Sequence, residues 1–292
     1  MSIEKPKVAL VLSGGAARGI AHMGVIEELE ERGYEISSIA GTSMGALIGG
    51  VYATGKMEEL KEYMYTLDRS KVFRLVDFTL SRQGLIKGDR VLNKMKKYVP
   101  DMLIEDLSIP YAAVAADMIK REEVVFRSGS LYHAIRASIA IPSIFTPVKE
   151  ENRLLVDGGI LNNLPMAHVE RTEGDRLVAV HVNADIPPLK PEKTREGVRK
   201  QALYQKKIKE FYSHIHPSSS TPEEKLGHFS LITESFELMI ARMAEEKIKE
   251  HAPDVLINVS RESCNLYDFY KAEEQVENGR RAAKAALDAL HP

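Results

Sequence analysis

The chain has 292 residues, 44% hydrophobic and 28% charged, which is the composition of an ordinary soluble globular protein. Its 40 basic and 42 acidic residues leave a net charge of −2, so no overall positive field favours nucleic acid, and its one cysteine excludes a disulfide framework and a thiolate zinc site. No apolar run approaches the ~20 residues of a membrane span, and the amino-terminal run VALVL is shorter than the ~7–15 residues of a signal peptide, so we expect a cytoplasmic protein.

Short apolar runs alternate with helical patterns along the chain. Strands are expected at residues 8–12, 36–40, 111–116, 123–126, 153–156, 176–182 and 254–259. Helices are expected at residues 19–33, 44–55, 89–99, 222–252 and 273–290. Most of the apolar runs are too hydrophobic for half-exposed strands, so the pattern predicts an α/β fold whose mostly parallel sheet is buried on both faces.

Residues 190–221 are the best candidate for a helical insertion or lid within a single domain spanning 1–292. Residues 190–210 include eight basic and three acidic side chains, which gives a local net charge of +5. The following PSSST marks a loop. Such a basic segment could dock on anionic lipid, which would make the protein peripheral on a membrane. A solvated lid or an oligomer contact is the alternative that we favour, although nothing in the sequence indicates an oligomer.

The strongest local signal is a G-x-S-x-G string formed by Gly41, Thr42, Ser43, Met44 and Gly45. It lies between an apolar strand and a helical run, the context of a nucleophile elbow, where a serine sits on a strained turn. Glycines two positions away on each side leave room at such a turn. An ordinary tight βα turn is the alternative. The serine follows only the second strand, which argues against the ordinary α/β-hydrolase order.

A glycine-rich loop, SGGAARG, follows the first strand. It fails the Walker A pattern after Gly19, and Ala16 breaks the dinucleotide fingerprint, which leaves a nucleotide-binding module as a weak alternative. The loop instead suits an oxyanion hole built from N–H groups around Gly14, Gly15 and Ala16. Arg18 could add a positive charge there or could pair with a surface carboxylate.

A serine nucleophile needs a base, and Asp157 is the better candidate. It ends a predicted strand and enters the turn Gly158-Gly159, so it belongs to the same edge of the sheet. Partial burial would raise its pKa and make it a stronger base. The alternative is a turn or capping aspartate. None of the nine histidines lies in a catalytic motif, and His181 is more simply a core residue.

Taken together, SGGAARG, GTSMG and VDGGILNNLP resemble the patatin-like phospholipase family, and the helical segment before the last strand is similar to its smaller bacterial members. The match covers roughly residues 7–182 and includes RASIAIPSIFTPV before the third motif. The resemblance implies a three-layer α/β/α fold and a Ser–Asp dyad without histidine. Supports for the aspartate turn would be Val156, Asn162, Asn163 and Pro165.

The resemblance also assigns roles to the residues. Ser43 would be the nucleophile and Asp157 the base, and the loop from Gly14 to Arg18 the oxyanion hole. Ala16 stands where the family usually has a third glycine, so the geometry of the hole depends on whether that position needs a positive φ.

The activity implied is that of a serine acyl hydrolase, a carboxylic ester hydrolase acting on lipids or simple esters through an acyl-enzyme, with no metal or cofactor. Acyl transfer to another acceptor is a variant of the same chemistry. A catalytically silent regulator on the same fold is the alternative from another class.

Overall fold

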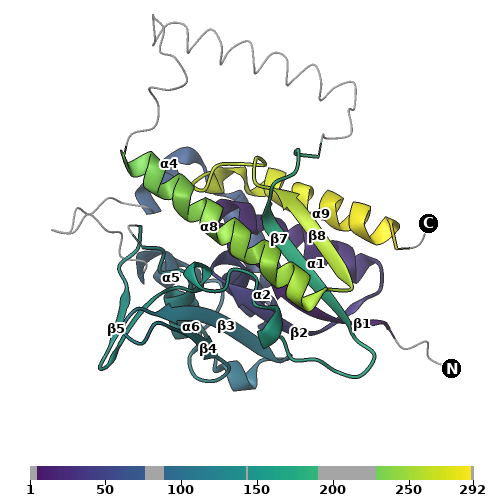
Figure 1. Cartoon of the computed structure of the whole chain (residues 1–292), viewed down its shortest axis with the longest axis horizontal. Coiled ribbons are helices and arrows are strands. Elements are labelled where there is room, and N and C mark those ends of the chain that lie inside the picture. Colours follow the sequence, from purple (N-terminus) through teal and green to yellow (C-terminus); the bar gives the residue numbers. More distant parts are fainter. Residues whose placement is uncertain (1–4, 76–88, 143, 190–227, 291–292) are drawn as a thin grey trace, which may run out of the picture. The chain divides into compact units, whose positions relative to one another are not determined.

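The protein is described here by a computed structural model that covers residues 5–75, 89–142, 144–189 and 228–290 (Figure 1). The basic segment 190–221 lies outside these residues, as does the start of the helix expected at 222–252. The chain divides into two compact units, Met1–Pro188 with Ile240–Pro292, and Leu189–Met239. The single domain spanning 1–292 stays a prediction.

The described residues contain one mixed sheet with the strand order β5-β6-β3-β2-β1-β7-β8, in which β4 also pairs with β3. The strands are β1 (Lys7–Leu12), β2 (Glu35–Thr42), β3 (Tyr111–Asp117), β4 (Glu122–Phe126), β5 (Val148–Glu150), β6 (Arg153–Asp157), β7 (Arg176–Ala184) and β8 (Val255–Ser260). From β3 through β2, β1 and β7 to β8 all pairs are parallel, whereas β4, β5 and β6 pair antiparallel. The prediction of a mostly parallel sheet is confirmed. Of the strands in the described residues, only β5 was not predicted from the sequence, because its three residues VKE are too few to show a hydrophobic pattern.

The described helices flank this sheet. The α-helices are α1 (Ala21–Glu31), α2 (Met44–Ala53), α3 (Met57–Tyr65), α4 (Arg69–Leu75), α5 (Asp89–Met95), α6 (Leu131–Ser138), α8 (His228–His251) and α9 (Ala272–Asp288). Short 3₁₀ turns are η1 (Ala16–Ile20), η2 (Ile104–Asp106), η3 (Gly158–Ile160), η4 (Met166–His168) and η6 (Phe269–Lys271). Of the α-helices, α3, α4 and α6 were not predicted. The last begins where the Ser130 side chain accepts the His133 N–H, a serine cap that favours a helix start.

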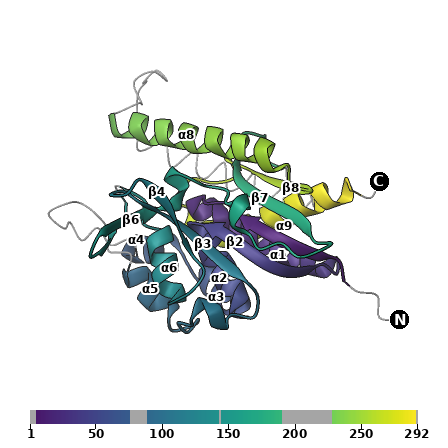
Figure 2. The same ribbon diagram turned by 60° about the horizontal axis from the view of Figure 1, so that its bottom comes forward.

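Alternate residues of β1 serve the two faces of the sheet, as the pleat requires. Its residues Val8, Leu10 and Leu12 join the larger core, which the helices α1, α2, α3 and α9 cover, whereas its other buried residues join a smaller core beneath Ile248 of α8 and the segment 164–169. In Figure 2, α1, α2 and α3 lie together on one side of the sheet. The predicted three-layer α/β/α fold is confirmed.

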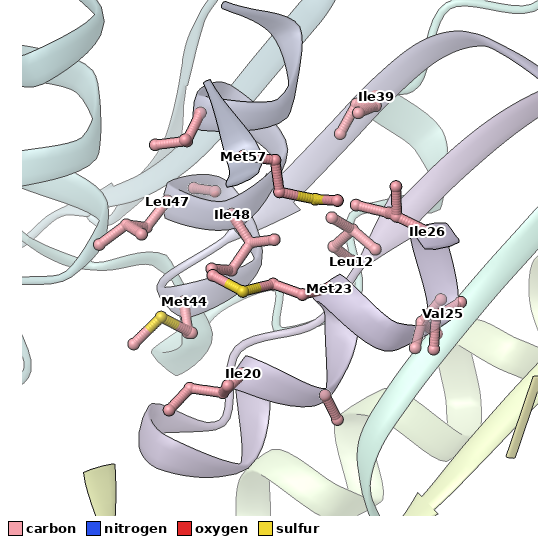
Figure 3. Packing of buried hydrophobic residues seen from close by; sticks show 14 of the residues in the cluster. Leu12, Ile20, Met23, Val25, Ile26, Ile39, Met44, Leu47, Ile48 and Met57 are labelled. Carbon is pink, nitrogen blue, oxygen red and sulfur yellow. The ribbon is translucent and has the colours of Figure 1, made fainter. Parts of the chain in front are cut away.

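Side chains from several elements interlock in the larger core (Figure 3). Met23 of α1 points toward Ile48 of α2, and Met57 of α3 lies close to Leu12 of β1. These residues are between 0% and 9% exposed. The two helices that begin at the glycine-rich loop and at the serine turn are therefore fixed to each other by packing.

Helices α1 and α9 approach so closely that each has a glycine against the other's backbone. A Cβ at Gly24 would lie 1.8 Å from the Val276 carbonyl oxygen, and a Cβ at Gly279 would lie 1.8 Å from the Ala21 carbonyl oxygen. Any side chain there would meet backbone, so both positions need glycine. The carboxyl-terminal helix is thus part of the support for α1. In the part of the chain that the structure describes, no helix has the length and apolar character to cross a membrane.

Candidate active site

The glycine-rich loop and the serine turn are neighbours because they follow adjacent parallel strands. Residue Leu12 of β1 pairs with Gly41 of β2, and each strand then enters its turn. The turns are packed without space between them: a Cβ at Gly45 would lie 2.2 Å from the Leu12 carbonyl oxygen. Both turns lie at the carboxyl end of the sheet, where α/β proteins gather their sites.

Ser43 has the strained backbone expected of a nucleophile elbow. Its φ of 55° and ψ of −122° lie outside the regions that a side chain prefers. The Ser43 N–H donates to Ser138 Oγ at 2.8 Å, and Leu47 N–H donates to the Ser43 carbonyl at 3.1 Å. A Cβ at Gly41 would lie 2.5 Å from Ala46 N, so the turn closes only with glycine there.

Asp157 and Ser43 come together because their strands, β6 and β2, both pair with β3. Thr42 of β2 pairs with Val114, and Asp157 of β6 pairs with the next residue, Ala115. Because β4 pairs with β3 on both sides of this point, it occupies one edge of β3, and β2 and β6 must share the other edge end to end. The two strands run toward each other there, which brings the residues Ser43 and Asp157 to one junction.

The Asp157 carboxyl is buried, with 5% of the residue exposed. Burial raises its pKa to about 6, against the smaller lowering effects of the Ser43 hydroxyl and the Gly159 N–H. The Gly159 N–H donates to Oδ1 at 2.8 Å, and the Asp157 N–H donates to the Ala140 carbonyl at 3.0 Å. Among the described residues, Oδ2 has no hydrogen-bond partner, and the Ser43 hydroxyl is near enough to the carboxyl to act on its pKa.

Within the glycine-rich loop, two N–H groups are available to a ligand. Gly14 N–H donates to the Asn163 carbonyl and Arg18 N–H to the Gly15 carbonyl, both at 3.1 Å. The N–H groups of Gly15 and Ala16 have no partner among the described residues. Ala16 has a φ of 47°, so the position where the family usually has glycine does require a positive φ, and alanine adopts it.

The loop lies directly against the serine. A Cβ at Gly14 would lie 3.0 Å from the Ser43 Cβ and 2.5 Å from Asn163 Oδ1. The unpartnered N–H groups of Gly15 and Ala16 follow immediately. This arrangement suits donors to an oxygen that gains negative charge beside Ser43.

Arg18 is buried, 7% exposed, and two of its side-chain hydrogen bonds go to neutral oxygens. Its Nε donates to the Cys264 carbonyl at 3.2 Å and its Nη1 to Asn183 Oδ1 at 2.9 Å. The guanidinium therefore ties the loop to β7 and to the segment before α9. The two roles that the sequence left open for Arg18, a positive charge at the reacting centre and a pair with a surface carboxylate, stay predictions.

The other glycines of the three motifs lie where neighbouring backbone or side-chain atoms leave no room for a Cβ. A Cβ at Gly158 would lie 2.4 Å from the Val114 carbonyl oxygen, and one at Gly19 would lie 2.4 Å from Met44 Cγ. Gly159 contributes the N–H that binds the Asp157 carboxylate. Each is a support of the turn on which its motif depends.

The residues after the aspartate brace both turns. The Asn162 carbonyl accepts the Thr42 hydroxyl at 2.8 Å, and the Asn163 carbonyl accepts the Gly14 N–H. Val156 pairs with β3 one residue before Asp157, and Pro165 precedes η4. The predicted supports thus lie at the end of β6 and in the segment that connects it to β7.

Two buried histidines are neutral core residues. Burial lowers the pKa of His181 and of His22 to about 4, and the His22 Nε2 lies 2.8 Å from the Ser13 carbonyl oxygen. The interpretation of His181 as a core residue is supported by its 5% exposure.

An apolar cavity of about 110 Å³ begins at Ser43 and Ala16. Its walls come from α2, α3, α5 and the segment around η6, with Leu47, Met64 and Met95 among the lining residues. Flexible methionines suit a cavity that adapts to a chain-like apolar ligand.

Two residues of this centre were missed in the sequence. Ser138 ends α6 and donates to the Val114 carbonyl at 2.6 Å while accepting the Ser43 N–H, and no motif marked it within RASIAIPS. Asn183 contacts the loop from β7. A polar residue near the carboxyl end of an otherwise apolar strand was the signal that could have identified Asn183.

Comparison with known proteins places this geometry in a family. A family model described as patatin-like phospholipase matches residues 10–169. An uncharacterized NTE family protein of Mycobacterium tuberculosis is 34% identical, over 98% of this chain and 93% of its own length. Lysophospholipase NTE1 of Candida glabrata is 26% identical over 97% of this chain, which corresponds to 16% of that protein.

The fold has a solved counterpart. VipD from Legionella pneumophila superposes with a TM-score of 0.50 at 17% identity, covering 98% of this chain and 67% of VipD, which supports the fold alone. The family match covers the loop, the serine turn and the aspartate turn, and the M. tuberculosis relative extends over nearly the whole chain. This chain belongs to the patatin-like phospholipase family.

Proposed function

We propose that this protein is a lipid acyl hydrolase of the carboxylic ester class, with Ser43 as nucleophile and Asp157 as general base. The observation that carries the proposal is the junction of β2 and β6, where a strained serine and a buried carboxylate come together. Family membership supports hydrolysis of lipids. The relative named lysophospholipase supports a lipid with a single acyl chain as the first substrate to try.

The environment of Asp157 suits a base. With a pKa of about 6, the carboxyl is about nine-tenths ionised at neutral pH, yet it binds a proton more strongly than an ordinary aspartate. Its Oδ2 has no hydrogen-bonded partner among the described residues and is the oxygen that would take the Ser43 proton. The Gly159 N–H holds Oδ1 and fixes the carboxyl plane.

The reaction follows in two steps. Ser43 Oγ attacks the ester carbonyl as its proton passes to Asp157, and the N–H groups of Gly15 and Ala16 bind the oxyanion. Asp157 then returns the proton to the leaving alcohol, and the acyl group remains on Ser43. In the second step water attacks the acyl-enzyme while its proton passes to Asp157, and Asp157 returns the proton to Ser43 Oγ as the bond to the acyl carbon breaks and the acid leaves.

The apolar cavity beside Ser43 supports an acyl chain as the group that binds inside. Its walls are almost wholly apolar, so burial of methylene groups contributes about 0.8 kcal/mol each. A polar headgroup finds few partners on these walls and would stay outside. The proposal therefore assigns the cavity to the acyl part of the substrate.

The test is hydrolysis of p-nitrophenyl esters of short to long acyl chains and of a lysophospholipid by wild type, Ser43→Ala and Asp157→Asn. We expect both variants to lose activity by about 10³-fold or more while staying folded. Ser37→Ala, in β2, and Asp175→Asn, before β7, are matched controls outside the centre. A fluorophosphonate should label wild type on Ser43, read by peptide mass. Activity that survives Ser43→Ala would refute the proposal.

A further inference from the structure

The Gly14–Gly15 peptide of the loop is held by the side chain of Asn183. The Asn183 Nδ2 donates to the Gly14 carbonyl oxygen at 2.7 Å, and Asn163 Nδ2 makes a longer contact of 3.4 Å to the same oxygen. A Cβ at Gly15 would lie 2.3 Å from Val182 Cγ2 and 3.2 Å from Asn183 Oδ1. The loop therefore rests directly on the end of β7.

Holding this carbonyl fixes the next N–H. The Gly14 C=O and the Gly15 N–H belong to one planar trans peptide unit and point in roughly opposite directions. A donor that binds the oxygen on the β7 side turns the Gly15 N–H away from β7. That N–H is one of the two without a partner among the described residues.

Arg18 determines which end of the Asn183 amide faces the loop. Its Nη1 donates to Asn183 Oδ1 at 2.9 Å, so the oxygen faces the guanidinium and the NH₂ faces Gly14. The positive charge on the oxygen side also polarises the amide and strengthens its donor. The Arg18 Nε is in turn anchored on the Cys264 carbonyl.

We propose that Asn183 is a positioning residue that aims the Gly15 N–H at the oxyanion, and that Arg18 acts through it. The inference deepens the proposed function and rests on it. Arg18 then contributes through a chain of hydrogen bonds from Cys264 to Gly14, and its charge acts on the oxyanion through the Asn183 amide. Asn183 touches the loop and not the reacting atoms.

The decisive variant is Asn183→Asp, which keeps the shape and can still accept from Arg18. At neutral pH the introduced carboxylate has no hydrogen to donate, so an acceptor faces the Gly14 carbonyl oxygen. We expect kcat to fall by about 10–100-fold, less than the roughly 10²–10³-fold for outright loss of an oxyanion donor, with KM nearly unchanged. Asn258→Asp makes the same chemical change on the neighbouring strand β8 and should change kcat less than twofold.

Two readouts separate positioning from a general structural role. Protonation lets the introduced carboxyl donate again, and because Arg18 favours its charged form, the ratio of variant to wild-type kcat should rise only as the pH falls below about 4. A trifluoromethyl ketone, which forms an oxyanion on Ser43, should lose affinity in proportion to kcat/KM, whereas binding of the fatty acid product should not change.

A measurement without turnover distinguishes failure of this inference from failure of the proposed function. The sequence has three Gly-Gly pairs, 14–15, 49–50 and 158–159, so protein labelled with glycine carrying ¹³C at the carbonyl and ¹⁵N gives one carbonyl-to-amide NMR signal for each. Asn183→Asp should move the 14–15 signal and leave the 49–50 signal in place, and Asn258→Asp should move neither.

An unmoved 14–15 signal would overturn the inference even in an active enzyme. A moved signal with kcat within twofold of wild type would remove the catalytic role. The signal could also move in Asn183→Asp while the wild type hydrolyses no ester and is not labelled on Ser43. This result would refute the proposed function and with it the role of the aimed N–H. A moved signal with the expected fall in kcat supports both.

Discussion

Asp157→Asn should inactivate the protein and stabilise it. The Asp157 pKa of about 6, against an ordinary 3.8, corresponds at 1.36 kcal/mol per pH unit to about 3 kcal/mol by which the buried charge destabilises the fold. The carboxyl binds its proton more tightly in the folded state, so the unfolding free energy falls as the pH rises from 3.8 to about 6 and stays low above it. Asparagine has no charge to bury and can still accept the Gly159 N–H.

The assay is urea unfolding of wild type and variant at about pH 5 and about pH 8. The stability gained by Asp157→Asn should be about 1–2 kcal/mol larger at the higher pH, because roughly half of the cost has developed at pH 5. The kcat/KM of wild type should rise over the same range with an apparent pKa near 6. A variant that is destabilised equally at both pH values would refute the reasoning.

Asp175→Asn is the matched control because the sign reverses. Burial alone would raise the pKa of Asp175, but the Thr172 N–H and the Arg171 guanidinium, each 2.6 Å from a carboxylate oxygen, lower it overall. The folded state therefore favours the charged form, and this stability is present above the ordinary pKa and lost in acid. Asparagine at this position should destabilise the protein equally at pH 8 and pH 5, and the loss should shrink only below about pH 3.8, whereas the effect of Asp157→Asn changes between pH 5 and pH 8.

Further variants test the supports of the centre. Ser138→Ala should destabilise the protein by about 1–3 kcal/mol, because buried main-chain groups lose their partner, and should slow fluorophosphonate labelling of Ser43. Ala16→Gly should raise the unfolding free energy by up to about 1 kcal/mol in urea unfolding, because relief of the left-handed φ outweighs the added chain entropy. Gly279→Ala should lower the melting temperature, with a loss of at least about 1–3 kcal/mol, because its Cβ meets the Ala21 carbonyl.

Each of these has an outcome against it. Unchanged labelling in Ser138→Ala would mean that Ser43 needs no fixed N–H, and a less stable Ala16→Gly would mean that the positive φ costs alanine little. For the helix contact, Ala285→Val on the exposed face of α9 is the control and should be nearly neutral. An equal loss in both α9 variants would show that the close approach to α1 is not the cause.

The motifs predicted most of the centre because they report local backbone needs. The strings around Ser43 and Asp157 each need glycines where a Cβ would meet backbone. The same short motif therefore contains both the reactive residue and the glycines that its turn requires. Ser138 and Asn183 act through single hydrogen bonds made across the fold, and a serine or asparagine in a helix or strand carries no local mark of such a partner. The alanine at position 16 gave no sign of its positive φ, since alanine usually avoids it, and only the family's usual glycine there raised the question.

The sequence predicted the strands whose hydrophobic pattern is strong. It did not predict the strand pairings, which depend on tertiary contacts. The buried strands β1, β3 and β7 are nearly continuous apolar runs. By contrast, the sharing of one β3 edge by β2 and β6 depends on registers that no local pattern specifies. Asp157 could be placed at a strand end from sequence, but not beside Ser43.

That shared edge also bears on how the protein folds. The pairing of Thr42 with Val114 closes a long loop, and the pairing of Asp157 with Ala115 closes another, so the junction is made of contacts distant in sequence. Helices such as α2 and α9 need only local contacts and can form earlier. During refolding, recovery of the proposed esterase activity should therefore lag behind recovery of the helical circular dichroism signal, because Ser43 and Asp157 meet only when β3 has paired with both strands.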